Sequence, residues 1–471
     1  MGNLRATGVF AALLSVSSII GLCSCGGGSG APAGGAGAQG TANVFTVGTD
    51  APLQGVVSCQ MTVSGVTLND ASGNSVSVLN NPAVVDFAQL SGLHQLIDLS
   101  SVPTDTYVSA TVTLANPSIG FIDTTQNPPT ITTVNGTLSP ATVTVNFPSQ
   151  FMLTDSQMVG LRMEFDLHQS LETDGNGNIT GTVDPVFHMQ LLGADDSSVS
   201  IDDFMAGVVS TSGDSFMVQG PKGRQWTVQT NANTIFDDPS ITISQYTTQT
   251  IVAVTGSLDP VSKDIDASEV EVVSMDGFYL AGLFTSIRPP SPQPATAADL
   301  FVRAELPAIN GIQDGEITTL TLSGNEGYRI ANIKNPITTL LFNNTLLAPG
   351  QSVAVGGKLN TVNGVSTLTP HRVVLRRQGQ EGTLVPGQTV VQSGNQGSFD
   401  LTDNWTDGIL LPNPLPVLTT NATNFINLSG LSGLTGTTAL PLRVVGFVLI
   451  NPANGTPVMV ARSVEQLPST N

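Results

Sequence analysis

The stretches LRMEFDLHQSL (161–171) and VDPVFHMQLL (183–192) decide the fold class. In both, apolar residues alternate with polar ones, and a period of two is that of a half-buried β-strand. We therefore expect the two stretches to form an antiparallel hairpin. Because the apolar side of each arm must face the same core, the pairing register is fixed. It sets these residues opposite each other: Leu161 and Leu191, Met163 and Met189, Phe165 and Phe187, Leu167 and Pro185, and Glu164 and His188.

The loop between the two arms contains DGNGN (174–178), which allows two interpretations. Oxygen-bearing side chains at alternate positions are typical of calcium loops, so Asp174, Asn176 and Asn178 are candidate calcium ligands. The distal Glu and the flanking helices of an EF-hand are missing, however. Gly175 and Gly177 can adopt positive φ, so a turn explains the run without a metal. We favour the turn and expect no cofactor, with calcium as the alternative.

Strand patterns of the same kind surround this pair. TYVSATVTL (106–114) alternates with period two, and VGTDAPLQGVVSCQMTVSGV (47–66) is similarly rich in β-branched residues. Short strands separated by turn residues predict a β-sandwich over residues 44–195. Within it, Cys59 is expected to be a small buried apolar residue.

Four motifs in this region carry a resemblance to a known family: FTVGTDAP (45–52), VSGVTL (63–68), VDFAQLSG (85–92) and VPTDTY (102–107). With these motifs the region resembles the bacterial domain of unknown function 4382, which follows lipoprotein signals in secreted proteins. The resemblance implies a prealbumin-like sandwich and no known activity. Thr104 and Asp105 stand where the family often has a Gly before the Tyr, which affects only the turn type.

The composition excludes some classes of function. Charged residues make up 11% of the 471 residues, against about 25% in a typical domain. The formal net charge is −20, and such a surface repels phosphate backbones. The 49 glycines and 29 prolines indicate many turns and few long helices. We expect an exported β-protein that does not bind nucleic acid.

Residues 1–25 predict a lipoprotein signal peptide. An Arg precedes an apolar run that is too short for a comfortable membrane span. The run ends in LCSC (22–25), which resembles a lipobox, and Cys25 is the expected lipidation site because the small Ser24 precedes it. Several acyl chains would anchor the protein stably to a membrane, on the periplasmic or cell-surface side of the envelope. The alternative is an ordinary secretory signal with incidental cysteines. Residues 26–43 are Gly-rich and predict a flexible tether.

The remaining sequence repeats one closing pattern, a strand with a Gly followed by a loop and a second strand. It occurs as IVAVTGSL (251–258) with ASEVEVV (267–273), as SVAVGGKL (352–359) with HRVVL (371–375), and as LRVVGFVL (442–449) with MVARSV (459–464). The Gly would permit the bend that a small barrel needs. These segments resemble the repeats called domain of unknown function 5666, which are OB-like. We therefore expect an all-β fold in which the N-terminal sandwich is followed by three small OB-like β-barrel repeats, at residues 203–275, 276–378 and 379–468.

No catalytic motif is recognisable. The sequence lacks a nucleophile elbow, a zinc-protease motif, a Walker loop and a dinucleotide fingerprint, so we do not expect an enzyme. Aromatic side chains could serve as platforms for a glycan, although core or edge packing explains each of them at least as well, and we favour packing. These aromatic candidates are Trp226, Trp405, Tyr246, Tyr279 and Tyr328.

The sequence as a whole predicts a membrane-anchored cell-envelope lipoprotein with a structural or ligand-binding role. Its expected partners are the lipid membrane, through the N-terminal acyl chains, and a glycan or an envelope protein. The alternative is an envelope enzyme that acts on polysaccharide, for which two carboxylates or a His–Asp pair would have to meet in one cleft.

Overall fold

The structure is a computed structural model that describes residues 40–467. Within this range, residues 52, 54, 91–94, 124, 126–129, 175–177, 194–199, 221–224, 239, 260, 261, 263, 276, 332–337, 363, 364, 404–409, 437 and 438 are not described. The expected signal peptide, with Cys25, and the expected tether up to residue 39 also lie outside the described residues. The expected all-β class is confirmed: strands in several sheets make up nearly all regular structure, and α1 (Leu167–Ser170) has only four residues.

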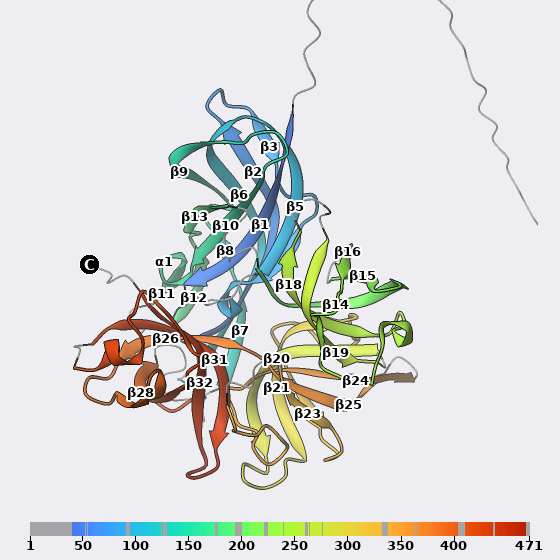
Figure 1. Cartoon of the computed structure of the whole chain (residues 1–471), viewed down its shortest axis with the longest axis vertical. Coiled ribbons are helices and arrows are strands. Elements are labelled where there is room, and N and C mark those ends of the chain that lie inside the picture. The colour runs from blue at the N-terminus through green and yellow to red at the C-terminus, as the bar shows by residue number, and fades with distance from the viewer. Residues whose placement is uncertain are drawn as a thin grey trace, which may run out of the picture. The chain divides into compact units, whose positions relative to one another are not determined.

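Two sheets near the N-terminus share one hydrophobic core, and we call them the N-terminal sandwich (Figure 1, blue to green). The first has the order β13-β10-β1-β5, with β13 at Phe187–Gly193, β10 at Met158–Asp166, β1 at Thr41–Ala51 and β5 at Gln95–Pro103. The second has the order β3-β2-β6-β7, with β3 at Ser75–Ser77, β2 at Val56–Asp70, β6 at Thr106–Asp123 and β7 at Thr130–Asn135. In addition, β4 (Ala83–Asp86) pairs with β2, and β9 (Thr142–Met152) pairs with β6. Cys59, on β2, is fully buried as expected.

The pairing register predicted for residues 161–191 is confirmed between β10 and β13. Leu161 pairs with Leu191, Met163 with Met189, Phe165 with Phe187, and Glu164 with His188. The prediction was wrong at its inner end, where Leu167 begins α1 instead of pairing with Pro185. Between the arms lies a second small sheet, made of β11 (Leu171–Thr173), β12 (Ile179–Val183) and β8 (Thr137–Leu138). Leu167 is still fully buried, but it reaches the core from the helical turn α1 and not from a strand.

Three successive sheets of six, six and seven strands follow, which we call the first, second and third β-units, and five strands of each occupy equivalent places. These five are β14 (Ser200–Ser212), β15 (Ser215–Gln219), β16 (Gln225–Gln229), β18 (Ile251–Leu258) and β19 (Ile265–Ser274); then β20 (Gly277–Arg288), β21 (Ala297–Leu306), β22 (Ile317–Thr321), β24 (Ser352–Val362) and β25 (Val365–Leu375); then β26 (Gln378–Leu384), β28 (Gln396–Asp403), β29 (Leu415–Thr419), β31 (Pro441–Asn451) and β32 (Thr456–Gln466). The other strands are β17 (Ile235–Phe236) in the first β-unit, β23 (Gly327–Ile330) in the second, and β27 (Val390–Ser393) and β30 (Asn424–Ile426) in the third.

All three β-units share one pattern of strand pairing. The first strand pairs antiparallel with the second and the fourth, the second with the third, and the fourth with the fifth. In the first β-unit the third and fifth strands, β16 and β19, pair in parallel, which closes a five-stranded barrel. The pairing of β29 with β32 completes the same ring in the third β-unit. In the second β-unit no such pairing of β22 with β25 occurs among the described residues.

The closing patterns seen in the sequence are the fourth and fifth strands of each β-unit. In each, the register shifts at the glycine, so that Gly256, Gly357 and Gly446 occupy equivalent β-bulges. A Cβ at these positions would lie 2.1–2.2 Å from a backbone carbonyl oxygen of the paired strand. Only glycine allows the two backbones to approach so closely, which explains why this residue marks the same place three times.

The N-terminal sandwich packs against the β-units. The outer side of the β1–β5 sheet shares a core with the first β-unit through Phe45, Leu96 and Leu192, among others. Val57 and Ile122 share another core with Phe301 of the second β-unit and with the third β-unit. All described residues thus belong to one compact unit, Gly40–Asn471.

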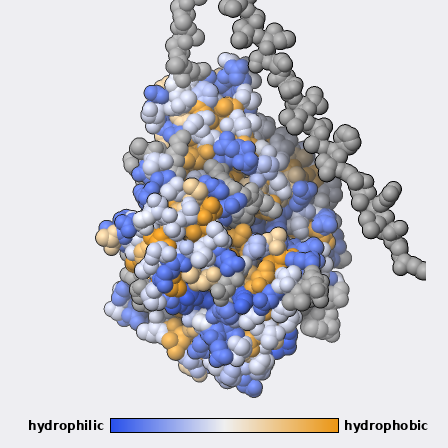
Figure 2. All heavy atoms as spheres, turned by 90° about the vertical axis from the view of Figure 1, so that its right-hand side faces the viewer, coloured by the Kyte–Doolittle hydropathy of each residue, from blue (hydrophilic) through white to orange (hydrophobic). Residues whose placement is uncertain are grey.

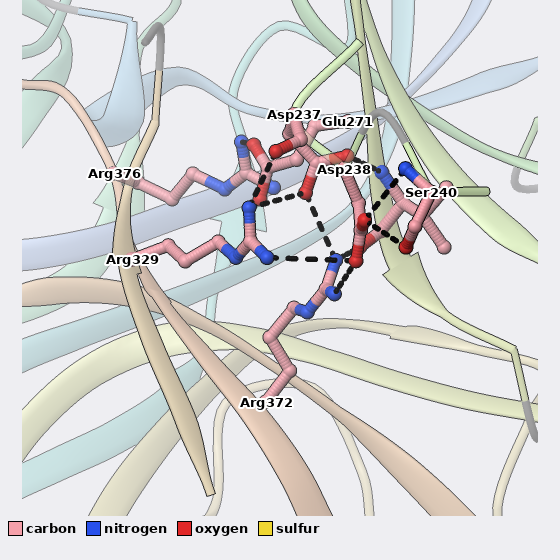
Figure 3. A network of polar contacts seen from close by, with 8 residues as sticks. Asp237, Asp238, Ser240, Glu271, Arg329, Arg372 and Arg376 are labelled. Carbon is pink, nitrogen blue, oxygen red and sulfur yellow. Dashed lines mark hydrogen bonds and ion pairs between the residues drawn. The ribbon is translucent and has the colours of Figure 1, made fainter.

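A charged network joins the first and second β-units (Figure 3). Asp237 accepts a hydrogen bond from the Val272 amide at 2.9 Å, and its other oxygen lies 2.9 Å from Nη1 of Arg372. Arg329 lies 3.5 Å from the carboxylate of Asp238. Hydrogen bonds from Ser240 lower the pKa of Asp238, against the effect of partial burial. Since a lowered pKa favours the folded state only while the carboxyl is ionised, this contribution is present at neutral pH and is lost as the pH falls through the folded-state pKa.

The described surface is mixed in character. On the face seen in Figure 2, apolar residues form small patches separated by polar ones. No helix among the described residues is long and apolar enough to cross a membrane.

Two glutamines on β26 differ sharply in their hydrogen bonding. The side-chain oxygen of Gln378 accepts a hydrogen bond from the backbone N–H of Ser352 at 2.8 Å, and its side-chain nitrogen donates to the Gly350 carbonyl at 3.1 Å. Gln380 is fully buried, and neither polar atom of its side chain has a partner among the described residues. We expect Gln380→Met to raise the free energy of unfolding by about 1–3 kcal/mol, because a buried amide without partners is costly.

The matched control is Gln378→Met, which should lower the free energy of unfolding by about 1–3 kcal/mol. This substitution leaves the Ser352 N–H and the Gly350 carbonyl without the side chain to which they are hydrogen-bonded. Urea denaturation of both variants checks the pair. Equal destabilisation by the two substitutions would show that Gln380 is hydrogen-bonded after all.

Candidate functional site

A cavity of about 500 Å³ opens where the N-terminal sandwich, the first two β-units and the segment 376–379 meet. We call it the junction cavity. Its wall therefore comes from four stretches that are distant in the sequence. A concave site of this size, lined by apolar groups and a few polar ones, is typical of small-molecule binding sites.

The sandwich side of the cavity is held rigidly. Asp86, at the end of β4, accepts hydrogen bonds from Ser58 Oγ at 2.8 Å, from the Cys59 amide at 2.7 Å and from Gln89 Nε2 at 2.8 Å. Gln60, on the adjacent β2, donates to the backbone carbonyl of Arg303 at 2.7 Å. These bonds fix the polar groups of this wall and tie it to the second β-unit.

The first β-unit supplies an aromatic wall. Phe204 on β14 and Trp226 on β16 meet edge to face, with ring centroids 6.4 Å apart. Tyr279 on β20 of the second β-unit also lines the cavity. Trp226 and Tyr279 are almost fully buried, so they contribute aromatic surface to the cavity and very little to the outside of the protein.

Three buried arginines line the junction cavity: Arg303, Arg376 and Arg377. Burial lowers the pKa of the Arg303 guanidinium, and the charge of nearby Asp86 opposes this. Arg303 also donates to the Val57 carbonyl. Arg376 forms an ion pair with the buried Glu271, at 2.9 Å. Arg303 and Arg376 thus belong to a network of polar contacts between the units that enclose the cavity.

The mouth of the cavity is exposed and carries both polar and apolar residues. The exposed residues that line it are Asn81, Pro82, Gln95, Ala308 and Asp314. The charged lining residues are Arg303, Arg376 and Arg377 against Asp86, Glu305 and Asp314, so the two signs occur in equal number. The lining therefore offers both hydrogen-bond donors and acceptors, with no excess of either charge.

The sandwich side of this site lies within a stretch that matches a known family. Residues 41–180 match the family described as Domain of unknown function (DUF4382). This stretch is a DUF4382 domain. The resemblance to this family is thereby confirmed, and the lining residues from 60 to 97 all belong to the DUF4382 domain. No curated protein and no solved structure matches the chain significantly.

The structure brings together some of the residues that the sequence singled out. Trp226 and Tyr279 both line the junction cavity, beside the DUF4382 domain. Tyr246 packs edge to face on Phe216 instead, with centroids 5.5 Å apart, and burial raises its pKa. Tyr328 packs on Phe342, and Trp405 lies outside the described residues.

Two of the candidate calcium ligands, Asp174 and Asn178, are hydrogen-bonded to each other near the end of the DUF4382 domain. The Asn178 amide donates to Asp174 Oδ1 at 2.9 Å, and the Asp174 amide donates to the Asn178 carbonyl at 2.8 Å. Asn176 lies outside the described residues. Among the residues that the structure describes, no group of three or more His, Cys, Asp or Glu side chains could hold a metal.

The sequence analysis missed the three arginines. A signal was present, because RAE (303–305) and RRQ (376–378) follow directly on the buried strand residues Val302 and Leu375. Buried charged residues are rare unless they are paired. In a chain with only 15 basic residues, such positions point to a polar site or to an interface.

Proposed function

We propose that this protein is a cell-envelope lipoprotein, anchored through Cys25, which binds a small ligand in the junction cavity. The observation that carries the binding role is the cavity itself, with its hydrogen-bonded polar wall and its aromatic lining residues. The signal-peptide pattern and lipobox support export and anchoring, on the periplasmic or cell-surface side of the envelope.

The strand pairing of the β-units also supports a binding role. Rings of five strands in this order are consistent with OB-like barrels, a fold used for oligonucleotides and oligosaccharides. The net charge of −20 disfavours nucleic acid, which leaves saccharides and other small molecules as the better candidates.

An enzyme acting on polysaccharide is the second candidate function. Its reacting carboxylates would have to meet in the same cavity. Since Asp86 there accepts three hydrogen bonds from the protein itself, we favour binding.

The anchor is tested by detergent phase separation. We expect the wild-type protein, produced in a bacterial host with lipoprotein processing, to partition into Triton X-114, and Cys25→Ala to move to the aqueous phase. Loss of the thiol removes the group to which the lipid is attached. Stable anchoring needs at least two acyl chains, because a single chain gives only marginal membrane binding. Cys23→Ala is the matched control and should still partition into detergent. The reverse outcome for the two variants would show that the lipidation site is misassigned.

A further inference from the structure

We infer that the junction cavity binds an uncharged, polyhydroxylated ligand of the size of a mono- or disaccharide. This inference rests on the proposed binding function and names the class of ligand.

Three ionic groups of the wall have partners inside the protein. Arg376 pairs with Glu271 at 2.9 Å, Arg303 donates to the Val57 carbonyl, and Asp86 accepts three hydrogen bonds. The lining arginines and carboxylates are equal in number. A charged ligand would add an unbalanced charge to a largely buried site, or would have to displace one of these partners, and both changes are costly.

An apolar ligand fits the wall no better. It would cover the amides of Gln60, Asn81 and Gln95 and cut off the water that reaches them. A roomy cavity with polar walls holds water, and a ligand gains affinity there only if it reproduces the hydrogen bonds of the waters that it displaces.

A sugar satisfies both demands. Each hydroxyl group can donate and accept, so it can bond to guanidinium and amide donors and also to carboxylate and carbonyl acceptors. The C–H faces of a sugar ring suit the apolar side chains in the lining, such as those of Trp226, Tyr279 and Leu306. The volume of about 500 Å³ accommodates a small ligand and excludes a long polymer.

Calorimetric titration of the purified full-length protein tests this inference. The neutral probes are glucose, N-acetylglucosamine, maltose and cellobiose, the anionic probes are glucuronate and inorganic phosphate, and the apolar probe is palmitate. We expect at least one neutral saccharide to bind, and neither the anionic nor the apolar probes to do so.

Three variants locate the binding. Ala308→Trp fills the mouth from an exposed position and should abolish saccharide binding, whereas Ala453→Trp, on an exposed turn outside the cavity lining, should leave it unchanged. The double variant Asn81→Ala with Gln95→Ala removes exposed amides at the mouth and should weaken binding at least fivefold.

The outcomes separate the ligand class from the proposed function. If glucuronate, phosphate or palmitate binds in a manner blocked by Ala308→Trp and the neutral sugars do not, the saccharide class is wrong and the binding function stands. Saccharide binding that survives Ala308→Trp would place the site elsewhere and overturn the inference. If none of the probes binds, both the inference and the proposed binding role are rejected.

Discussion

Asp237→Ala is expected to lower the free energy of unfolding by about 3–5 kcal/mol, because it removes the nearer of the two carboxylates that pair with the partly buried Arg372 and leaves only Asp238, at 3.7 Å. Only 1% of the Asp237 side chain is exposed, and Arg372 is 16% exposed. The substitution also removes the acceptor for the Val272 amide. Figure 3 shows that Asp237 lies between elements of two β-units, so its loss weakens the junction between them. Urea denaturation at neutral pH measures the effect.

The matched control is Asp299→Ala, which breaks the pair of Asp299 with Arg288. That arginine is 49% exposed, and exposed pairs contribute about 0–1 kcal/mol. The hydrogen bond from Arg288 lowers the pKa of Asp299, so the small contribution of this pair should disappear in acid, as the pH falls through that pKa. If Asp237→Ala were as mild as Asp299→Ala at neutral pH, the Asp237 network would not stabilise the junction.

Phe301→Ala is expected to cost about 3–5 kcal/mol of unfolding free energy, since it empties a fully buried aromatic site. Phe301 lies in the core that joins the second and third β-units with Val57 and Ile122 of the N-terminal sandwich. The void left by the substitution would therefore weaken the contact between these units as well as the packing inside the second β-unit. Thermal and urea unfolding measure the loss.

Ile317 provides the control, because it pairs with Phe301 across the neighbouring strand but is 43% exposed. Ile317→Ala should change the free energy of unfolding by no more than about 0.5 kcal/mol. The sandwich side of the contact can be tested with Gly120→Ala, whose Cβ would lie 2.6 Å from the Phe301 ring and should cost about 1–3 kcal/mol. Gly65→Ala on the same sheet has only ordinary contacts and should not destabilise. Equal effects of the two glycine substitutions would mean that the sandwich does not pack on Phe301.

The shared cores give the N-terminal sandwich a structural role beyond its own fold. It covers the first β-unit through the outer side of the β1–β5 sheet and contacts the second through Gly120. The junction cavity exists only because these parts meet, and Gln60 and Arg303, which are 243 residues apart, are hydrogen-bonded at its edge. A binding role for this cavity would therefore belong to the whole chain from the DUF4382 domain to the start of the third β-unit.

Local pattern was sufficient to predict much of this architecture. The alternation around Phe165 and Phe187 fixed the register of β10 and β13, since shifting either arm by one residue would turn its apolar side chains out of the core. Gly256, Gly357 and Gly446 marked three equivalent strand pairs because no side chain fits where the two backbones approach so closely. The prediction was wrong at Leu167 because period two does not reveal where a buried strand gives way to a helical turn.

The sequence by itself determined the all-β class, the strand pair at 161–191 and the positions of the repeated closing strands, because these depend on residues that are near one another in the chain. Only the tertiary structure decided that Trp226 and Tyr279 share a cavity with Arg303 and that Asp237 faces Arg372. The physical reason is that a strand pattern specifies which side of the strand is buried but not against what. A charged residue in such a strand acquires its partner only when distant units pack together.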